Sequence, residues 1–161
     1  TTNTIFSYEF TYDPKIKDDE FLDMISKSEG TFGKGDNGYN VIVGGDLFHD
    51  YSDHPHIAVD LPKLGIKSTA AGRYQILGRY FDVYKKQLKL PDFGKESQDK
   101  IAIQLIKECK AIDDIEAGRI ESAIKKCASR WASLPNAGYG QHENKMSSLI
   151  VAFENFGGTL A

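Results

Sequence analysis

One carboxyl in the sequence combines the residue type and the position that proton transfer requires. Between Asp18 and Gly30 the apolar residues Leu22 and Ile25 follow the i, i+3 spacing of one helical face, and position i+7 of that face is Glu29. A carboxyl at the core-facing end of a helix is partly desolvated, which raises its pKa and keeps a proton available near neutral pH. The spacing leaves a second interpretation open, in which Glu29 turns out to water or pairs with a lysine.

Three other kinds of site are disfavoured. The segment 30–35 has the glycine spacing of a phosphate loop, but Asp36 stands where that motif requires lysine, and a helix precedes it in place of a strand. The histidines and aspartates of the loop 50–56 could be drawn as a metal cluster, yet no HExxH is present. No GxSxG segment exists, and neither cysteine has the context of a nucleophile. We therefore expect no metal and no cofactor.

The elements that would position Glu29 begin with a helix and a small β-lobe. Asp18 is expected to cap the helix that ends at Gly30. A short β-rich stretch, 39–43, is followed by Gly44-Gly45, which predicts a tight hairpin turn because both central positions of a type I′ turn need positive φ. A polar loop and a Pro-Lys turn near residue 62 come next. Residues 1–14 are an N-terminal extension with a predicted strand, because aromatic and polar residues alternate from 6 to 12.

The remainder of the chain is predicted to be helical. It contains four apolar stripes at helical spacing, which are Leu77, Phe81, Tyr84 and Leu88; Gln98, Ile101, Ala102, Leu105 and Cys109; Ile120, Ile124, Cys127 and Trp131; and Met146, Leu149, Ile150 and Phe153. Trp131 is accordingly assigned to the core. The fold class is α+β: a small hairpin lobe inserted between an N-terminal helix and a helical bundle forms a two-lobed cleft within one domain, 15–161.

Composition excludes several classes of protein. The chain has 161 residues, a net charge of -3 and no basic block, so a nucleic-acid partner and an anionic membrane held by long-range attraction are disfavoured. Its longest apolar run, residues 149–153, is far too short to cross a bilayer. Cys109 and Cys127 lie on apolar faces and are predicted to be buried free thiols, with one disulfide as the alternative. Eight tyrosines suit a polar ligand with apolar faces, although those at 8, 12, 80 and 84 look structural.

Several strings in the chain closely resemble the lambda-type phage endolysins. They run collinearly from about residue 20 to 160 and comprise 21–24 with 28–31, 39–45, 47–48 with 50–55, 68–69 with 71–75, Lys95 with 97–99, and 131–135 with 137–141. The resemblance implies a lysozyme-like fold and cleavage of the β-1,4 bond between N-acetylmuramic acid and N-acetylglucosamine in peptidoglycan. Enzymes of this type are lytic transglycosylases, and their single essential glutamate matches Glu29.

This resemblance implies that Glu29 acts first as general acid and then as base. Two-carboxylate glycosidases need a second carboxyl about 5 Å away as nucleophile or about 6.5 to 9.5 Å away as base. A transglycosylase needs neither, because the attacking oxygen belongs to the substrate. Asp36, Asp46, Asp50 and Asp53 lie in or near the expected β-lobe. A hydrolytic muramidase on the same fold therefore remains an alternative, as does a non-catalytic peptidoglycan-binding module.

Six further residues are predicted to bind substrate. Gln75, in a glycine-x-x-glutamine segment that resembles wider lytic transglycosylases, is expected to hydrogen-bond an N-acetyl or hydroxyl group, and Tyr74 precedes it. Tyr139, between two glycines, is implied to orient Glu29 or the sugar. The remaining three, Tyr51, Asp53 and His54, are expected to line the cleft from the hairpin lobe, with loop stabilisation as the other interpretation.

The resemblance also carries expectations about context. The partner is the glycan strand of peptidoglycan, the protein is a monomer, and a pore-forming holin aids its export. It is made in the host bacterial cytoplasm, acts in the periplasm or cell wall after release, and does not insert into the membrane. The chain shows no signal peptide.

Overall fold

Six helices and one two-stranded sheet make up the part of the chain that the computed structural model describes, residues 15–161, with side chains from residue 19. In chain order they are α1 (Lys15–Glu29), β2 (Val59–Leu61), β3 (Ile66–Ser68), α2 (Gly78–Leu88), α3 (Lys95–Glu108), α4 (Ile112–Glu116), α5 (Ile120–Cys127) and α6 (Met146–Asn155). The strand expected at residues 6–12 lies outside the described residues. None of the helices within 15–161 has the length and apolarity that a membrane crossing needs.

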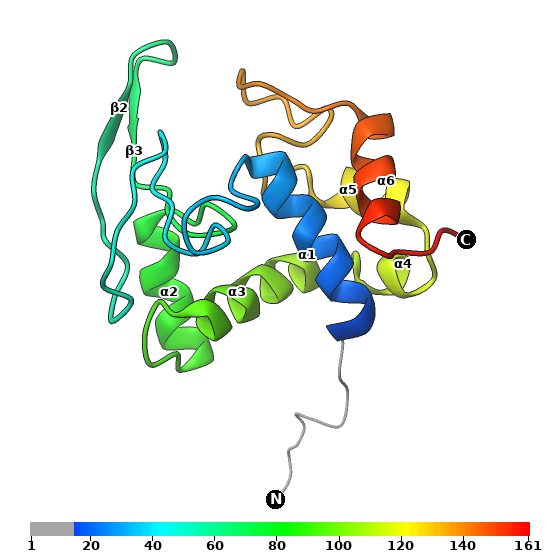
Figure 1. The fold of residues 1–161 in the computed structure, drawn as a ribbon, viewed down its shortest axis with the longest axis horizontal. Coiled ribbons are helices and arrows are strands. Elements are labelled where there is room, and N and C mark those ends of the chain that lie inside the picture. The colour runs from blue at the N-terminus through cyan, green and yellow to red at the C-terminus, as the bar shows by residue number, and fades with distance from the viewer. Residues whose placement is uncertain (1–14) are drawn as a thin grey trace, which may run out of the picture.

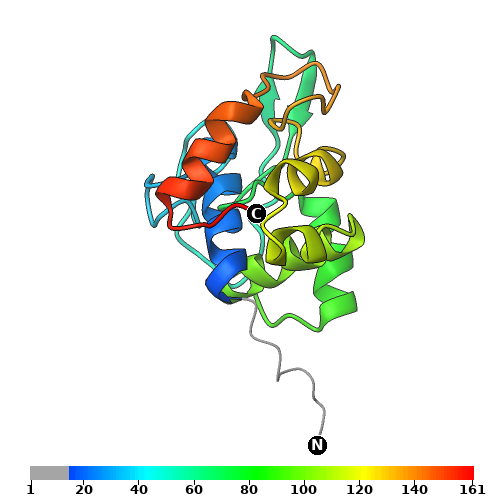
Figure 2. The same ribbon diagram turned by 90° about the vertical axis from the view of Figure 1, so that its right-hand side faces the viewer.

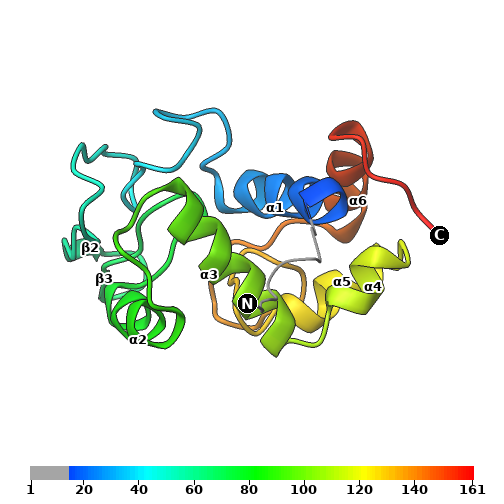
Figure 3. The same ribbon diagram turned by 90° about the horizontal axis from the view of Figure 1, so that it is seen from below.

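The molecule has two lobes joined by α3. The hairpin β2–β3 and α2 form one side, while α4, α5 and α6 form the other, with α1 between them (Figure 1). Seen from below, α1 and α6 lie side by side, and they pack together (Figure 3). The hairpin and the loop 136–145 extend to the same end of the molecule (Figure 2). The α+β class predicted from the sequence is confirmed.

Helix α1 owes its place to the apolar stripe seen in the sequence. Leu22 and Ile25 are buried as predicted, and they share one continuous core with residues of α3, α5 and α6. Gly30 follows the helix with φ +80°, a left-handed conformation that suits glycine and turns the chain away. One boundary prediction is wrong: the helix begins at Lys15, so Asp18 lies within its first turn and is not its N-cap.

The β-hairpin is not where the sequence analysis expected it. The segment 39–48 forms only isolated bridges, Val41 to Leu47 and Ile42 to Ala71, around the Gly44-Gly45 turn, in which both glycines do have positive φ. The regular antiparallel pair is β2–β3, in which Val59 faces Ser68 and Leu61 faces Ile66. The Pro-Lys turn near residue 62 is thus the hairpin turn. Each strand has only three residues, and none of them is buried, so neither gives the run of roughly 4 to 8 alternating residues that marks a strand in a sequence.

The helical stripes are confirmed in outline. Helix α5 ends at Cys127, so Trp131 lies beyond it, yet Trp131 is buried in the core as predicted. Cys127 is buried, Cys109 is half-buried, and both are free thiols. Tyr84 is buried, but Tyr80 is exposed on α2, so its assignment to the structural tyrosines is wrong. Tyr80 lies one position before the buried Phe81 and therefore falls off the apolar stripe.

Candidate active site

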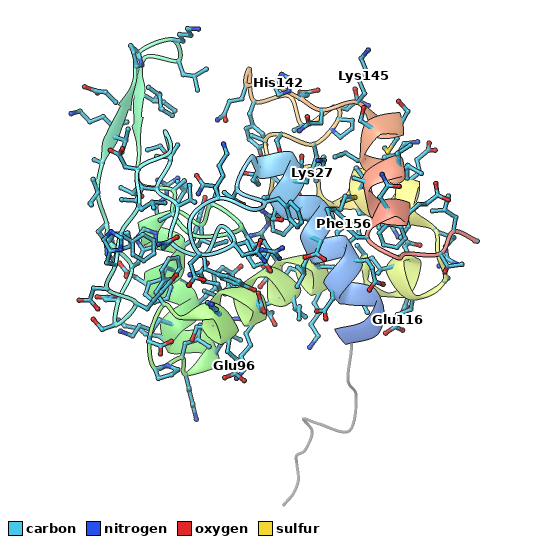
Figure 4. All side chains as sticks on the ribbon, viewed as in Figure 1. Lys27, Glu96, Glu116, His142, Lys145 and Phe156 are labelled. Atoms are coloured by element: carbon cyan, nitrogen blue, oxygen red, sulfur yellow. The ribbon has the colours of Figure 1, made fainter. Side chains whose placement is uncertain are left out.

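A cleft of about 590 Å³ lies between the two lobes. The hairpin lobe contributes Leu61, Ile66 and Ser68, and the opposite wall comes from residues around 129–132 with Tyr139 and Gln141. Residues 74–77, Arg79 and Tyr80 also line it, as does Glu29. A second hollow adjoins it, where the hairpin turn faces the loop that carries His142 (Figure 4). The cleft between a helical lobe and a β-hairpin lobe is therefore present as predicted.

Glu29 is the last residue of α1, and its half-buried side chain lies in the cleft lining. Its Oε2 accepts a hydrogen bond of 2.5 Å from Oγ of Ser133. Burial raises the pKa of Glu29 to about 7, and the Ser133 hydrogen bond, which favours the charged form, lowers it in part. Among the described residues its partner is a hydroxyl and not a lysine. Of the two interpretations left open by the spacing, the desolvated acid is the correct one.

A chain of polar groups holds Ser133 in place. Asn144 Nδ2 donates to Oγ of Ser28 at 3.0 Å, and the hydroxyls of Ser28 and Ser133 are 2.7 Å apart. Because the Ser133 proton is directed to Glu29, the proton between the two serines comes from Ser28. The hydrogen bonds therefore run in one direction, from Asn144 through both serines to the carboxyl of Glu29. Sequence reasoning missed Ser133 and Asn144, since neither lies on a patterned element.

Replacing Ser133 with Ala should raise the pKa of Glu29, and with it the pH at which any reaction driven by protonated Glu29 slows. Removing a hydrogen bond to the carboxylate raises the pKa of Glu29 above about 7. A reaction that starts from protonated Glu29 slows as the pH rises through this pKa, so the alkaline limb should shift upward by about 1 unit in Ser133→Ala. The measurement is the initial rate, from pH 5 to 9, of the glycan cleavage that the resemblance implies. Ser133→Thr, which keeps a hydroxyl, should restore the original limb, and identical limbs in all three proteins would contradict the assignment.

Gln75 and Tyr139 line the cleft together with Glu29. Gln75 has a left-handed backbone, φ +54°, and its Nε2 donates to the carbonyl oxygens of Val41 and Gly72 at 3.1 and 2.9 Å. Its Oε1 has no donor among the described residues and is left as an acceptor. The hydroxyl of Tyr139 donates to the carbonyl oxygen of Ser129 at 2.6 Å. Tyr139 thus forms part of the rim, and Ser133, not Tyr139, orients Glu29.

The side chain of Tyr74 does not serve the cleft as predicted. It is 1% exposed, and its hydroxyl donates to Oδ1 of Asp99 at 2.7 Å and accepts from the Arg73 guanidinium at 3.0 Å. Its carbonyl oxygen accepts from Nε1 of Trp131 at 3.1 Å. Tyr74 therefore ties the floor of the cleft to the core.

Tyr51, Asp53 and His54 do not line the cleft either, so their predicted placement is wrong. Tyr51 donates to Oδ2 of Asp36 at 2.8 Å, and Oδ1 of Asp53 accepts the backbone N–H of His54. His54 is buried among Phe81 and Phe93, where burial lowers its pKa, and its Nε2 lies 2.8 Å from the carbonyl oxygen of Ile76. The loop packs against the body of the lobe, because its aromatic and imidazole rings are buried there. Loop stabilisation, the other interpretation, describes these three residues.

A mainly helical lobe, a small antiparallel hairpin lobe and one desolvated glutamate in the cleft between them define a lysozyme-like domain. Two solved structures of bacteriophage lambda lysozyme share its fold: one, in complex with a chitohexasaccharide, has a TM-score of 0.87 at 51% identity, and the other has a TM-score of 0.83 at 50% identity. Each alignment covers 93% of this chain and 98% of the lambda chain.

Sequence comparisons identify the family. A family model described as Endolysin matches residues 19–160. The endolysin of Escherichia phage lambda is 55% identical over 145 residues, which cover 87% of this chain and 90% of that protein. The endolysin of Escherichia phage P2 is 50% identical over 153 residues, covering 88% and 93%. The chain belongs to the endolysin family. It is an enzyme that degrades peptidoglycan.

Proposed function

We propose that this endolysin is a lytic transglycosylase that cleaves between N-acetylmuramic acid and N-acetylglucosamine without consuming water. The observation that carries the proposal is that Glu29 is the only carboxyl among the described residues that line the cleft. A hydrolase of the two-carboxylate kind needs a second carboxyl within about 9.5 Å of the acid. An intramolecular nucleophile removes this need and gains the rate advantage of proximity.

The four aspartates considered as a second carboxyl lie outside the cleft, where they bind other groups or are exposed. Asp36 binds Tyr51 and Lys95, the latter at 2.9 Å. Asp50 accepts the backbone N–H of Ser52. Asp53 caps its own loop, and Asp46 is exposed beside the Gly44-Gly45 turn. None of the four lines the cleft, which favours the transglycosylase over the hydrolase.

In the proposed mechanism Glu29 first donates a proton to the substrate and then accepts a different proton from it. The protonated carboxyl donates to the glycosidic oxygen while the bond from that oxygen to the muramyl C1 breaks. The carboxylate then takes the proton of the muramyl C6 hydroxyl, whose oxygen forms a bond to C1 and closes the 1,6-anhydro ring. Glu29 ends protonated, as it began. A pKa of about 7 suits a group that must be acid and base in turn near neutral pH.

Two of the predicted residues are proposed to hold the sugar. The free Oε1 of Gln75 can accept a hydrogen bond from an N-acetyl N–H or a hydroxyl, because its amide nitrogen is fixed by the Val41 and Gly72 carbonyls. The ring of Tyr139, 55% exposed at the rim, offers a face on which a sugar ring can stack. The chitohexasaccharide bound by lambda lysozyme supports a glycan strand as the ligand of this cleft. We further propose that the protein works as a monomer, is made in the host cytoplasm and reaches the wall after release through a holin pore.

The product of the reaction tests this function. Isolated peptidoglycan digested with the enzyme should yield 1,6-anhydromuramic acid ends, which lack one water relative to a reducing end. Mass spectrometry of the soluble fragments measures the difference directly. Fragments with reducing-end muramic acid and no anhydro sugar would establish a hydrolytic muramidase on the same fold and overturn the transglycosylase.

A further inference from the structure

The cleft is cationic in a protein whose net charge is -3. Arg79 and Arg130 line the main cleft and Lys63 lines the adjoining hollow, while Glu29 is the only acid among the described lining residues of either. Burial raises the pKa of Glu29 to about 7, so near neutral pH it carries only part of a negative charge. The charge of the cleft is therefore opposite to that of the molecule, and this favours an anionic group on the ligand.

The two arginines differ in what they already bind. Arg130 donates to Oε1 of Glu108 at 2.8 Å and to the hydroxyl of Tyr84 at 3.4 Å. Arg79 has no such partner: its guanidinium carbon lies 4.8 Å from the centre of the Tyr80 ring, and no ion pair is formed with it among the described residues. Arg130 is thus occupied by the protein, and Arg79 keeps its donors for a ligand.

The position of Arg79 on α2 preserves this availability. The first turn of the helix contains no acidic residue. The acid one turn further along, Asp82, binds Nε2 of His56 at 3.0 Å. Stacking on Tyr80 restricts the orientation of the guanidinium and lowers the entropy that a ligand must remove. An arginine is charged at every working pH, and its planar fork matches a carboxylate bidentately.

We infer that Arg79 binds a carboxylate of the peptide stem on the muramyl unit, and so makes the enzyme prefer peptide-bearing, anionic glycan over neutral glycan. The inference rests on the proposed function, in that peptidoglycan strands occupy the cleft. A muramyl unit offers carboxylates in two ways. A substituted unit carries them on its stem, whereas the lactyl carboxylate is free only after the stem has been removed. Intact peptidoglycan therefore presents stem carboxylates.

The test compares Arg79→Gln with the wild type on three forms of soluble glycan strand: peptide-bearing strands, the same strands with their carboxyls amidated, and strands freed of stems by an amidase. On the first we expect Arg79→Gln to lower kcat/KM by about tenfold. On amidated strands both proteins should be equally slow, since the charge that Arg79 binds is gone. Arg79→Lys should recover part of the loss on charged strands. Lys86→Gln is the matched control, because it removes a cation from the same helix outside the cleft lining and should match the wild type on all three.

Three outcomes of the rate measurements would contradict the inference. Equal losses on charged and amidated strands would mean that Arg79 contacts neutral sugar or supports the fold, and no loss on charged strands would remove its role altogether. If Arg79→Gln lost as much activity on stem-free strands as on peptide-bearing strands, Arg79 would bind the lactyl carboxylate. The proposed binding of a stem carboxylate would then be wrong. Rates are counted as bonds broken, whatever the product. A reducing-end product would therefore overturn the transglycosylase and leave the result on Arg79 standing.

Discussion

Glu29→Gln is expected to lower the turnover of peptidoglycan by at least about a thousandfold, since in the proposed mechanism one carboxyl makes both proton transfers. The amide keeps the size and much of the hydrogen bonding of the side chain but can neither donate a proton to the glycosidic oxygen nor take one from the C6 hydroxyl. The measurement is the release of soluble fragments from isolated cell walls, alongside sedimentation with the same walls. Binding should persist while turnover is lost. If Glu29→Gln kept full function, the chain would be a binding module and its glutamate incidental.

Glu96→Gln is the matched control for this substitution. Glu96 is an exposed residue on α3, paired with Lys100, and lies far from the cleft (Figure 4). Glu96→Gln makes the same change of side chain outside the cleft and should leave turnover unchanged.

The stability of Glu29→Gln at two pH values tests whether the variant is correctly folded. The folded pKa of Glu29, about 7, is above its unfolded value of 4.5, so the folded state binds the extra proton between these pH values and loses stability as the pH rises through them. Above pH 7 the charged carboxyl lowers the free energy of unfolding by as much as about 3 kcal/mol. Glu29→Gln should thus be more stable than the wild type at pH 8, and the difference should shrink toward pH 4. Denaturant unfolding at both pH values measures it.

Arg73→Met should destabilise the fold by about 3–5 kcal/mol and lower its Tm by about 10 °C. Arg73 is 3% exposed and donates to Oδ1 of Asp23 at 2.6 Å, to the carbonyl of Asn37 and to the hydroxyl of Tyr74. It therefore ties the floor of the cleft to α1 and to the loop after it. Met fills a similar volume but leaves these partners with unsatisfied or newly exposed polar groups. Thermal and denaturant unfolding measure the loss.

The matched control for this prediction is Lys125→Met. The side chain of Lys125 is 60% exposed and that of its partner Glu121, at 3.1 Å, is 63% exposed, so we expect a cost below about 1 kcal/mol. Equal costs for the two substitutions would show that the Arg73 network contributes no more than a surface pair.

The sequence was sufficient for the apolar faces of α1, α2, α3, α5 and α6 and for the catalytic candidate, because both rest on local periodicity. The short helix α4, five residues long, was not predicted, since it has no such stripe. The i, i+3, i+7 face of α1 depends only on neighbours within two turns, and the packing of Leu22 and Ile25 fixes where Glu29 points. The same rule explains why the stripe of α2 was correct for Phe81 and Tyr84. It also separates the exposed Tyr80 from them, because Tyr80 lies off that stripe.

The hairpin and most of the substrate residues were beyond that reasoning for physical reasons. Strands β2 and β3 have only three residues each and no buried residue, so they are shorter than the roughly 4 to 8 alternating residues that predict a strand. His54 is polar by type, yet its ring packs in an aromatic cluster that only the tertiary fold assembles. Ser133 and Asn144 lie in loops, and their role follows only from hydrogen bonds to Glu29 and Ser28, which are far away in the sequence.

Those contacts join segments that are far apart in the chain. Ser133 follows Glu29 by 104 residues, and Asn144 follows Ser28 by 116. Because a chain emerges from the ribosome N-terminus first, a nascent chain that has just presented Glu29 lacks the hydroxyl of Ser133 and the amide of Asn144. Under the proposed mechanism, the capacity to cut the wall therefore arises only after about a hundred further residues have been made.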